Sequence, residues 1–433
     1  MSDTPTSRSM FSRGFLSLTI TQFLGATNDF LLKTVLTYGL AAAGMWSAML
    51  GEGGQVYPAY CLVVPFFLFC VIAGQVADRR SKQEVAVWVK KVEIFFALVA
   101  LAGFWLENFW LCLLAMMLLG IQSAFFSPAK YGLIPELVES KHLSRANGLI
   151  NMLTNLAAII ATVIAGFLYV AYRGPDAEAT SPGGLLWLPG TVMLVVAILG
   201  LIAVKQMPKL PAANPKGKLH FNPITPLLST LREMRHGGTP LFILAILWSV
   251  FFLMGYMVTL ILPDYTTVLS INGQPLNEEQ VGTYLLGPLG LAIGVGSLTA
   301  GWISGHKIQP RLVPIGAIGL TICFFVLGSL PDKIWLVVTF IVIAGLFAGF
   351  FIVPLQALVQ KLAPDESRGR IIGTTGAMAA LFEAVGIGIF QACKQVFEMN
   401  SQQVFLVLGG IFAVVTTVFY WKVRSRINRP EWQ

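Results

Sequence analysis

The chain has 433 residues, of which 56% are hydrophobic and only 12% are Asp, Glu, Lys or Arg. Soluble domains carry about 25% charged residues, so this chain has about half the charge that covers a water-facing surface. The composition excludes a soluble globular enzyme, a disordered chain and a nucleic-acid-binding domain. We therefore attribute the net charge of +8 to membrane topology and not to an anionic partner.

Twelve apolar runs approach the length of about 20 residues that a membrane-crossing helix needs. Six lie in the first half of the chain, at 14–44, 57–77, 84–106, 108–127, 146–172 and 184–204. Six lie in the second half, at 241–269, 280–304, 312–330, 334–360, 370–395 and 403–421. We predict an all-α integral membrane protein with a six-helix bundle at 1–204, a cytoplasmic linker at 205–240 and a second six-helix bundle at 241–433.

The distribution of basic residues predicts the orientation of these helices. With twelve crossings, 25 of the 29 Lys and Arg residues fall on one side, and the other four are Lys33, Arg173, Lys333 and Lys394. Cytoplasmic loops carry the excess of positive charge. We therefore expect both termini in the cytoplasm of a multi-pass protein.

Three motifs recur in the second half at a nearly constant spacing. Gly74 is followed by Gly301 after 227 residues, Pro128 by Pro354 after 226, and Arg145-x-x-Gly148 by Arg370-x-x-Gly373 after 225. This spacing indicates a parallel duplication, which places a substrate site near the midplane between two bundles. Chance matching of common Gly and Pro residues is the alternative. We expect Phe125–Pro128 to close the fourth helix.

The segment Gly74–Lys82 lies between the second and third runs. It resembles the G-x-x-x-D-R/K-x-G-R/K loop of the major facilitator superfamily, with Ser81 in place of the second glycine. The resemblance implies that Asp78 meets the N-terminus of the eleventh helix, where unpaired amides favour an anion. It implies gating roles for Gly74, Asp78, Arg79, Arg80 and Arg370. The alternative is a short basic turn without a gating role.

Three further motifs resemble the lysophospholipid transporter branch of that superfamily: Gln22–Asp29 in the first helix, Ser127–Gly132 after the fourth, and Ala146–Leu149 opening the fifth. The resemblance implies the major facilitator fold of two pseudo-symmetric six-helix bundles. It also implies inward movement of lysophospholipid across the bacterial inner membrane for re-acylation, with an acyltransferase or acyl-ACP synthetase as a partner. We expect a monomer that contacts membrane lipids.

Ionisable groups inside a membrane helix are functional candidates because their burial is costly. We single out Asp29, Lys33 and Glu383 near mid-span. Asp29 and Lys33 lie four residues apart on one helix face, so they either neutralise each other or bind a substrate ammonium and a phosphate. Glu383 matches an acidic position of the branch, and a structural interhelical hydrogen bond is its alternative. The chain departs from the branch at a third position, because it has Gly255 where the branch can carry an arginine in the seventh helix.

Neutral polar residues on the same helices are candidates to complete a cavity: Gln22, Asn28, Gln122, Asn151, Asn155 and Gln356. We favour Asn28 and Asn155, although such residues are often interhelical contacts. Lys130 is predicted at a helix end, as a phosphate contact or as an ordinary cytoplasmic lysine.

The sequence carries no motif for catalysis, a metal or a cofactor. The four histidines have no metal-ligand spacing, the five cysteines form no C-x-x-C pair, and Gly217-Lys218 lacks the upstream glycine of a P-loop. We therefore expect a transporter that is not an enzyme. A proton-coupled exporter of lipophilic drugs is the alternative function, and a membrane anchor for an acyltransferase is a third.

Overall fold

The helices of this chain follow its apolar runs. The structure, a computed structural model, describes residues 9–41, 44–50, 54, 57–174, 183–237, 240–264, 269–271, 274–276, 278–329 and 333–423. Each predicted apolar run holds one long helix, and the described residues contain twelve helices of 17 residues or more. Nine helical segments are long and apolar enough to cross a membrane within this part of the chain.

Residue contacts divide the chain into two units that interleave in sequence. The first unit comprises Met1–Leu137, Ala157–Arg232 and Pro364–Ala377, and the second comprises Val138–Leu156, Glu233–Ala363 and Met378–Gln433. Two long helices therefore contribute to both units, namely α6 (Leu143–Arg173) and α14 (Arg368–Gln391). In each case the residues near the N-terminus of the helix belong to a different unit from the rest.

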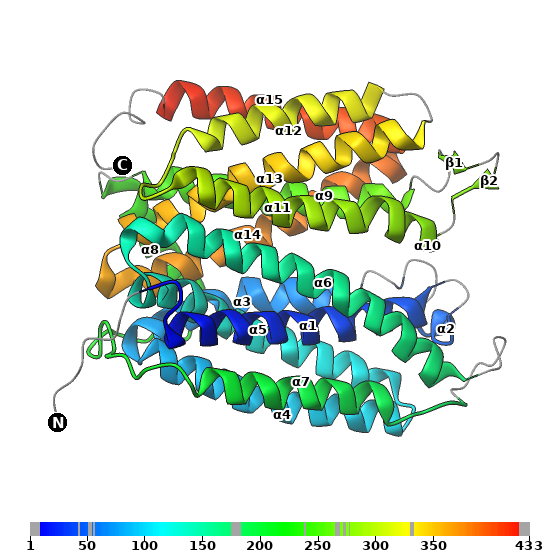
Figure 1. Cartoon of the computed structure of the whole chain (residues 1–433), viewed down its shortest axis with the longest axis horizontal. Helices are drawn as coiled ribbons and strands as arrows, with labels where there is room; N and C mark the ends of the chain where they lie inside the picture. The colour runs from blue at the N-terminus through cyan, green and yellow to red at the C-terminus, as the bar shows by residue number, and fades with distance from the viewer. Residues whose placement is uncertain are drawn as a thin grey trace. The chain divides into compact units, whose positions relative to one another are not determined.

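The first unit is built around α5 (Phe109–Leu137), which packs along both α3 (Tyr57–Arg79) and α4 (Lys82–Trp105). On the other side α4 packs on α7 (Leu188–Val204), and α7 packs on α1 (Arg13–Leu40) (Figure 1). The short helix α2 (Ser47–Leu50) follows α1. Buried residues of these helices and of α6 form a continuous apolar core that contains Phe104, Met116 and Tyr172.

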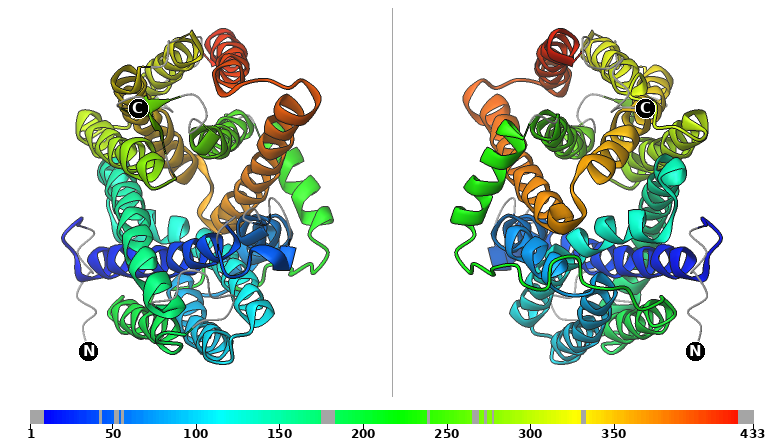
Figure 2. Two further views of the ribbon diagram at one scale, coloured as in Figure 1. Left: turned by 90° about the vertical axis from the view of Figure 1, so that its right-hand side faces the viewer. Right: turned by 90° about the vertical axis from the view of Figure 1, so that its left-hand side faces the viewer.

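The second unit is built around α13 (Ile334–Leu362), which packs on α11 (Gly287–Ser304), α12 (Leu312–Ser329) and α9 (Leu241–Asp264). The last long helix, α15 (Ser401–Val423), packs on α12, and Figure 2 shows these helices nearly end-on. Shorter elements complete the unit: a hairpin of β1 (Ser270–Ile271) and β2 (Gln274–Pro275), α10 (Glu278–Val281), and π-helical turns at Gly282–Leu286 and Ala392–Val396.

The predicted linker contains a helix, and the fourth predicted helix is longer than expected. The amphipathic helix α8 (Ile224–His236) lies within 205–240. Pro128 does not close α5, which continues to Leu137. Proline removes one backbone hydrogen bond to the carbonyl four residues before it, and the Cys70 thiol lies 3.5 Å from that carbonyl, Ala124 O, as its donor. Because another helix satisfies the freed carbonyl, the helix continues through the proline.

Close packing in the second unit depends on glycine. A Cβ atom on Gly316 of α12 would lie 2.6 Å from Phe351 N and 2.7 Å from Phe347 O of α13. These are backbone atoms of a packed helix, so they cannot move aside as a flexible side chain would. Gly410 of α15, by contrast, has nothing within 4 Å of the same position.

We predict that Gly316→Ala lowers the free energy of unfolding by about 1–3 kcal/mol, because the added methyl group overpacks a helix contact. Gly410→Ala is the matched control and should not destabilise the protein, since alanine favours a helix. Thermal unfolding of both purified variants in the same detergent measures the effect. Equal melting temperatures for the two variants would contradict the predicted packing.

Candidate functional site: a buried polar network and two helix-end contacts

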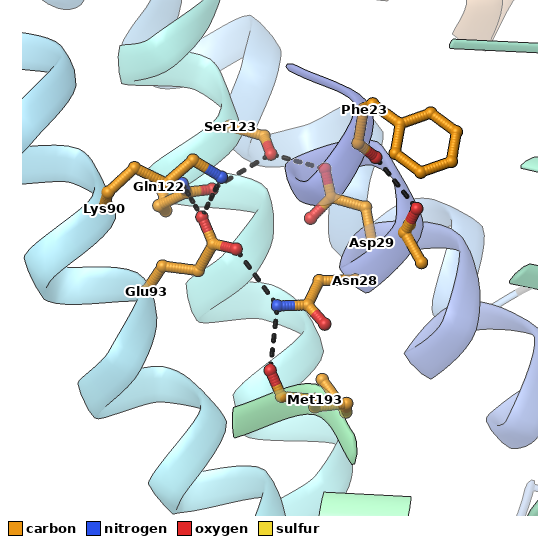
Figure 3. A network of polar contacts seen from close by, with 9 residues as sticks. Phe23, Asn28, Asp29, Lys90, Glu93, Gln122, Ser123 and Met193 are labelled. Carbon is orange, nitrogen blue, oxygen red and sulfur yellow. Dashed lines mark hydrogen bonds and ion pairs between the residues drawn. The ribbon is translucent and has the colours of Figure 1, made fainter. Parts of the chain in front are cut away.

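A group of buried polar side chains surrounds the Glu93 carboxylate in the first unit (Figure 3). Glu93 is 1% exposed. Its Oε2 atom lies 2.5 Å from Lys90 Nζ and accepts a hydrogen bond of 2.8 Å from Gln122 Nε2. Its Oε1 atom accepts a hydrogen bond of 3.0 Å from Asn28 Nδ2. Donors from α1, α4 and α5 therefore replace the water that this carboxylate would otherwise need.

Sequence reasoning missed the charged pair at the centre of this network. Lys90 was counted with the basic residues on the cytoplasmic side, and Glu93 was not singled out. In the structure both lie inside α4, and Lys90 is 0% exposed. The signal was present, since a Lys and a Glu three residues apart share one helix face and stand here in an otherwise apolar run.

A glycine of α1 makes room for the Lys90 ammonium, and a glycine of α7 lies at ordinary contact distance from it. A Cβ atom on Gly25 of α1 would lie 2.6 Å from Lys90 Nζ, and one on Gly200 of α7 would lie 3.6 Å from it. The Lys90 Nζ atom also lies 5.4 Å from the centroid of the Phe126 ring, a distance that allows a cation–π contact. Gly25 belongs to the Gln22–Asp29 motif, so the structure gives one residue of that motif a physical role.

The network reaches the two adjacent polar residues predicted on α1. Asn28 is 0% exposed, and its Nδ2 atom also donates to Met193 O of α7 at 3.2 Å. Ser123 Oγ donates to Asp29 Oδ2 at 2.6 Å and lies 3.1 Å from Gln122 Oε1. A chain of contacts therefore runs from Asp29 through Ser123 and Gln122 to Glu93 (Figure 3). The Asn28 Oδ1 atom is buried without a hydrogen-bond partner.

The other predicted site residues lie outside this network. The Lys33 Nζ atom lies 5.9 Å from the Phe30 ring centroid, and Glu383 is half-buried in α14. Asn155 Nδ2 donates to Asn151 O, one turn before it in α6, at 2.9 Å. Lys130 lies inside α5 and not at a helix end, because α5 continues through Pro128. Its Nζ atom lies 4.3 Å from the Tyr131 ring centroid.

Asp78 lies at the N-terminus of α14, where the sequence placed it. Its Oδ1 atom accepts from Gly369 N at 2.6 Å, and its Oδ2 atom accepts from Arg370 N at 2.8 Å. The first amides of a helix have no partner within the helix, and the positive end of the helix dipole favours a carboxylate. A Cβ atom on Gly74 would lie 3.0 Å from Arg370 Cα, so this glycine permits the close approach of α3.

A second contact joins α6 to α13 through side-chain amides. Asn147 Nδ2 donates to Gln360 Oε1 at 2.7 Å, and Gln360 Nε2 donates back to Asn147 Oδ1 at 2.9 Å. One turn further along both helices, Asn151 Nδ2 donates to Gln356 Oε1 at 2.8 Å. The sequence offered Asn151 and Gln356 as residues that complete a cavity, and the structure pairs them with each other.

The repeated motifs occupy corresponding places in the two units. Gly74 approaches Arg370 at the start of α14, and a Cβ atom on Gly301 of α11 would likewise lie 3.0 Å from Arg145 Cα near the start of α6. The residue at the position of Asp78 is Gly305, which ends α11 with a φ of 56°. This left-handed conformation favours glycine. The carboxylate contact is therefore present in only one of the two related places.

The chain belongs to the Major Facilitator Superfamily, whose family model matches residues 15–387. Together with its helices, this identifies a multi-pass membrane transporter of that fold.

Solved structures agree on the fold. The human organic anion transporter MFSD10 (TETRAN) superposes with a TM-score of 0.75 at 14% identity, over 94% of this chain and 98% of that one. The transporter FucP in the outward conformation superposes with a TM-score of 0.72 at 12% identity, over 94% of this chain and 98% of that one.

Curated relatives of similar length carry one common name, Lysophospholipid transporter LplT. The relative from Enterobacter sp. (strain 638) is 28% identical over 361 residues, which cover 82% of each chain. The relative from Klebsiella pneumoniae subsp. pneumoniae is 26% identical over 431 residues, covering 97% of this chain and 98% of the relative. The relative from Escherichia coli (strain K12 / DH10B) is 25% identical over 430 residues, with the same coverage.

We predict that Glu93→Gln destabilises the protein by about 3–5 kcal/mol, because it leaves the buried Lys90 ammonium without a counter-charge. The double variant Lys90→Met/Glu93→Gln should recover most of this loss, since both charges are then gone. Chemical denaturation of the three proteins in one detergent measures the difference. A double variant less stable than Glu93→Gln would show that the two charges do not act as a pair.

Proposed function

We propose that this protein is a secondary transporter of lysophospholipid, such as lysophosphatidylethanolamine, that moves its substrate across the bacterial inner membrane for re-acylation. The observation that carries the proposal is the Asp29 carboxylate, which a chain of polar contacts connects to a buried Lys90–Glu93 pair. Charged groups are retained inside membrane helices mainly where they serve a pathway or a ligand. The common name of the curated relatives supports lysophospholipid as the substrate class.

In this proposal the residues of α1 contact the lipid head group. Asp29 binds the head-group ammonium, and Lys33, one turn further along the same helix, binds the phosphate. Asn28 holds Asp29 in place through its bonds to Glu93 and to Met193 O. Asn155, Lys130 and Glu383 complete the set that the proposal assigns to substrate binding and coupling. A desolvated site strengthens each of these charged contacts.

Alternating access requires contacts that form in one state and break in the other. We assign this role to the Asp78 contact with α14, together with Gly74, Arg79, Arg80 and Arg370 around it. The amide pairs between α6 and α13 are assigned the same role. The proposal retains six-helix bundles at 1–204 and 241–433, cytoplasmic termini, a monomer, and an acyltransferase or acyl-ACP synthetase that consumes the imported lipid.

A proton-coupled exporter of lipophilic drugs would use the same fold and the same two carboxylates, Asp29 and Glu383. The names of the curated relatives favour lysophospholipid over this alternative. Expression of the protein separates the two functions, since an exporter raises drug tolerance and a lysophospholipid importer leaves it unchanged.

We predict that Asp29→Asn and Glu383→Gln each lower the uptake of labelled lysophosphatidylethanolamine into spheroplasts at least about tenfold, equivalent to about 1.4 kcal/mol. Loss of the head-group charge partner is the physical reason. Glu366→Gln, an exposed carboxylate just before α14, is the matched control and should leave uptake at the wild-type rate. Wild-type uptake by both site variants at equal membrane abundance would reject the assigned site.

We predict that Asp78→Ala changes the balance between the two access states without abolishing substrate binding. The change leaves the first amides of α14 without their carboxylate, so the state that contains this contact is destabilised relative to the other state. Labelling of single cysteines placed near each face of the membrane measures the balance. Unchanged labelling on both faces would count against a gating role for Asp78.

A further inference from the structure

A groove runs along the first unit between α3 and α4. Both helices pack along α5 but make few contacts with each other, so α5 forms the floor of the groove. Its volume is about 490 Å³, which lies in the range of about 300–1,000 Å³ that small-molecule sites occupy. The floor consists of Ile121, Gln122 and Phe125.

The walls of the groove are apolar except at one end. Val89, Val92 and Phe96 of α4 line most of its length, and the charged residues Arg80 and Glu84 lie at one end. Along α4 the distance from Glu84 to Phe96 is twelve residues, or about 18 Å at 1.5 Å per residue. One leaflet of a bilayer contributes about 15 Å of hydrocarbon, half of the total of about 30 Å. The groove, with its charged end included, therefore spans about the depth of one leaflet.

The charged end of the groove suits a zwitterionic head group. Arg80 and Glu84 are both exposed, and neither forms an ion pair with another described residue. A guanidinium binds a phosphate through two parallel hydrogen bonds, and a carboxylate accepts from a primary ammonium. Trp88, which also lines the groove, is 65% exposed and has Lys91 Nζ 4.9 Å from its ring centroid. Exposed Trp next to a basic residue is typical of the head-group level of a membrane.

We propose that this groove is a second lipid site, which holds one single-chain phospholipid with its chain along α4, its phosphate at Arg80 and its ammonium at Glu84. The site is separate from Asp29, because Asp29 is not among the residues that line the groove. The inference rests on the proposed function in one respect: the lipid is the imported lysophospholipid, held in the cytoplasmic leaflet before an acyl-transfer reaction consumes it.

One residue connects the groove with the buried network. Gln122 lies in the groove floor and is 5% exposed, and its Nε2 atom donates to Glu93. A lipid chain that fills the groove contacts Gln122 in the floor. An acyl chain in the groove therefore keeps water away from the hydrogen bonds of the network.

The test uses the purified full chain in lipid nanodiscs and a lysophosphatidylethanolamine with a diazirine near the end of its chain. After illumination, mass spectrometry of peptides locates the adducts. We expect adducts on 92–96 and 121–125. Val92→Trp fills the groove and should lower these adducts about tenfold, equivalent to about 1.4 kcal/mol. Val195→Trp, at a valine of α7 that is 50% exposed, is the matched control and should keep them.

Head-group variants test the charged end. Arg80→Gln should lower labelling by the lysophosphatidylethanolamine probe. It should also lower labelling by a lysophosphatidylglycerol probe with the same chain, whose head group lacks the ammonium. Glu84→Gln should lower labelling by the first probe only. Equal labelling of Val92→Trp and Val195→Trp, or adducts confined to other helices, overturns the site. Displacement of the probe by diacyl phosphatidylethanolamine as readily as by the lyso form overturns the single-chain assignment.

The two proposals can fail separately in this experiment. If spheroplasts take up lysophosphatidylethanolamine but no adducts appear in the groove, the groove inference is wrong and the transport proposal stands. If adducts appear in the groove but no uptake occurs, the transport proposal is wrong, and the groove is a lipid site of a protein with another function.

Discussion

A carboxylate that is 1% exposed inside an apolar helix bundle is stable only where donors surround it. Glu93 meets this condition through Lys90 of its own helix, Asn28 of α1 and Gln122 of α5. Loss of any one donor leaves charge in a medium that cannot solvate it. The positions of α1, α4 and α5 relative to one another are therefore tied to this single group, and so is the turn of α1 that carries Asn28 and Asp29.

The same requirement for partners explains the helix-end contacts. Asp78 is acceptable at the end of α3 because the first amides of α14 need acceptors. Asn147 and Gln360 satisfy each other in both directions, so neither leaves a buried amide unpaired. Each contact exists only while its two helices are close. A transporter needs contacts of this kind, since they stabilise one arrangement by a limited amount and can be broken without unfolding a helix.

The groove and the network together describe how such a bundle handles a lipid. An acyl chain needs only an apolar channel, which α3, α4 and α5 supply on their outer face. A head group needs charged partners, and Arg80 and Glu84 stand at one end of this groove. Gln122 belongs to both environments, because it is in the groove floor and also bonds to Glu93.

Composition and the spacing of apolar runs were sufficient to predict twelve long helices and their order, because each run in a membrane must satisfy its own backbone as a helix. The resemblance of three motifs to a known family implied the fold. The resemblance of Gly74–Lys82 to a loop of the superfamily also implied the contact of Asp78 with the start of α14, which the structure contains. Lys90 and Glu93 were not recognised as a buried pair, because only the packing of α4 against α1, α5 and α7 decides which face of α4 is inside. The contact at Pro128 was likewise decided by tertiary packing, because the Cys70 thiol that lies near the freed carbonyl belongs to another helix.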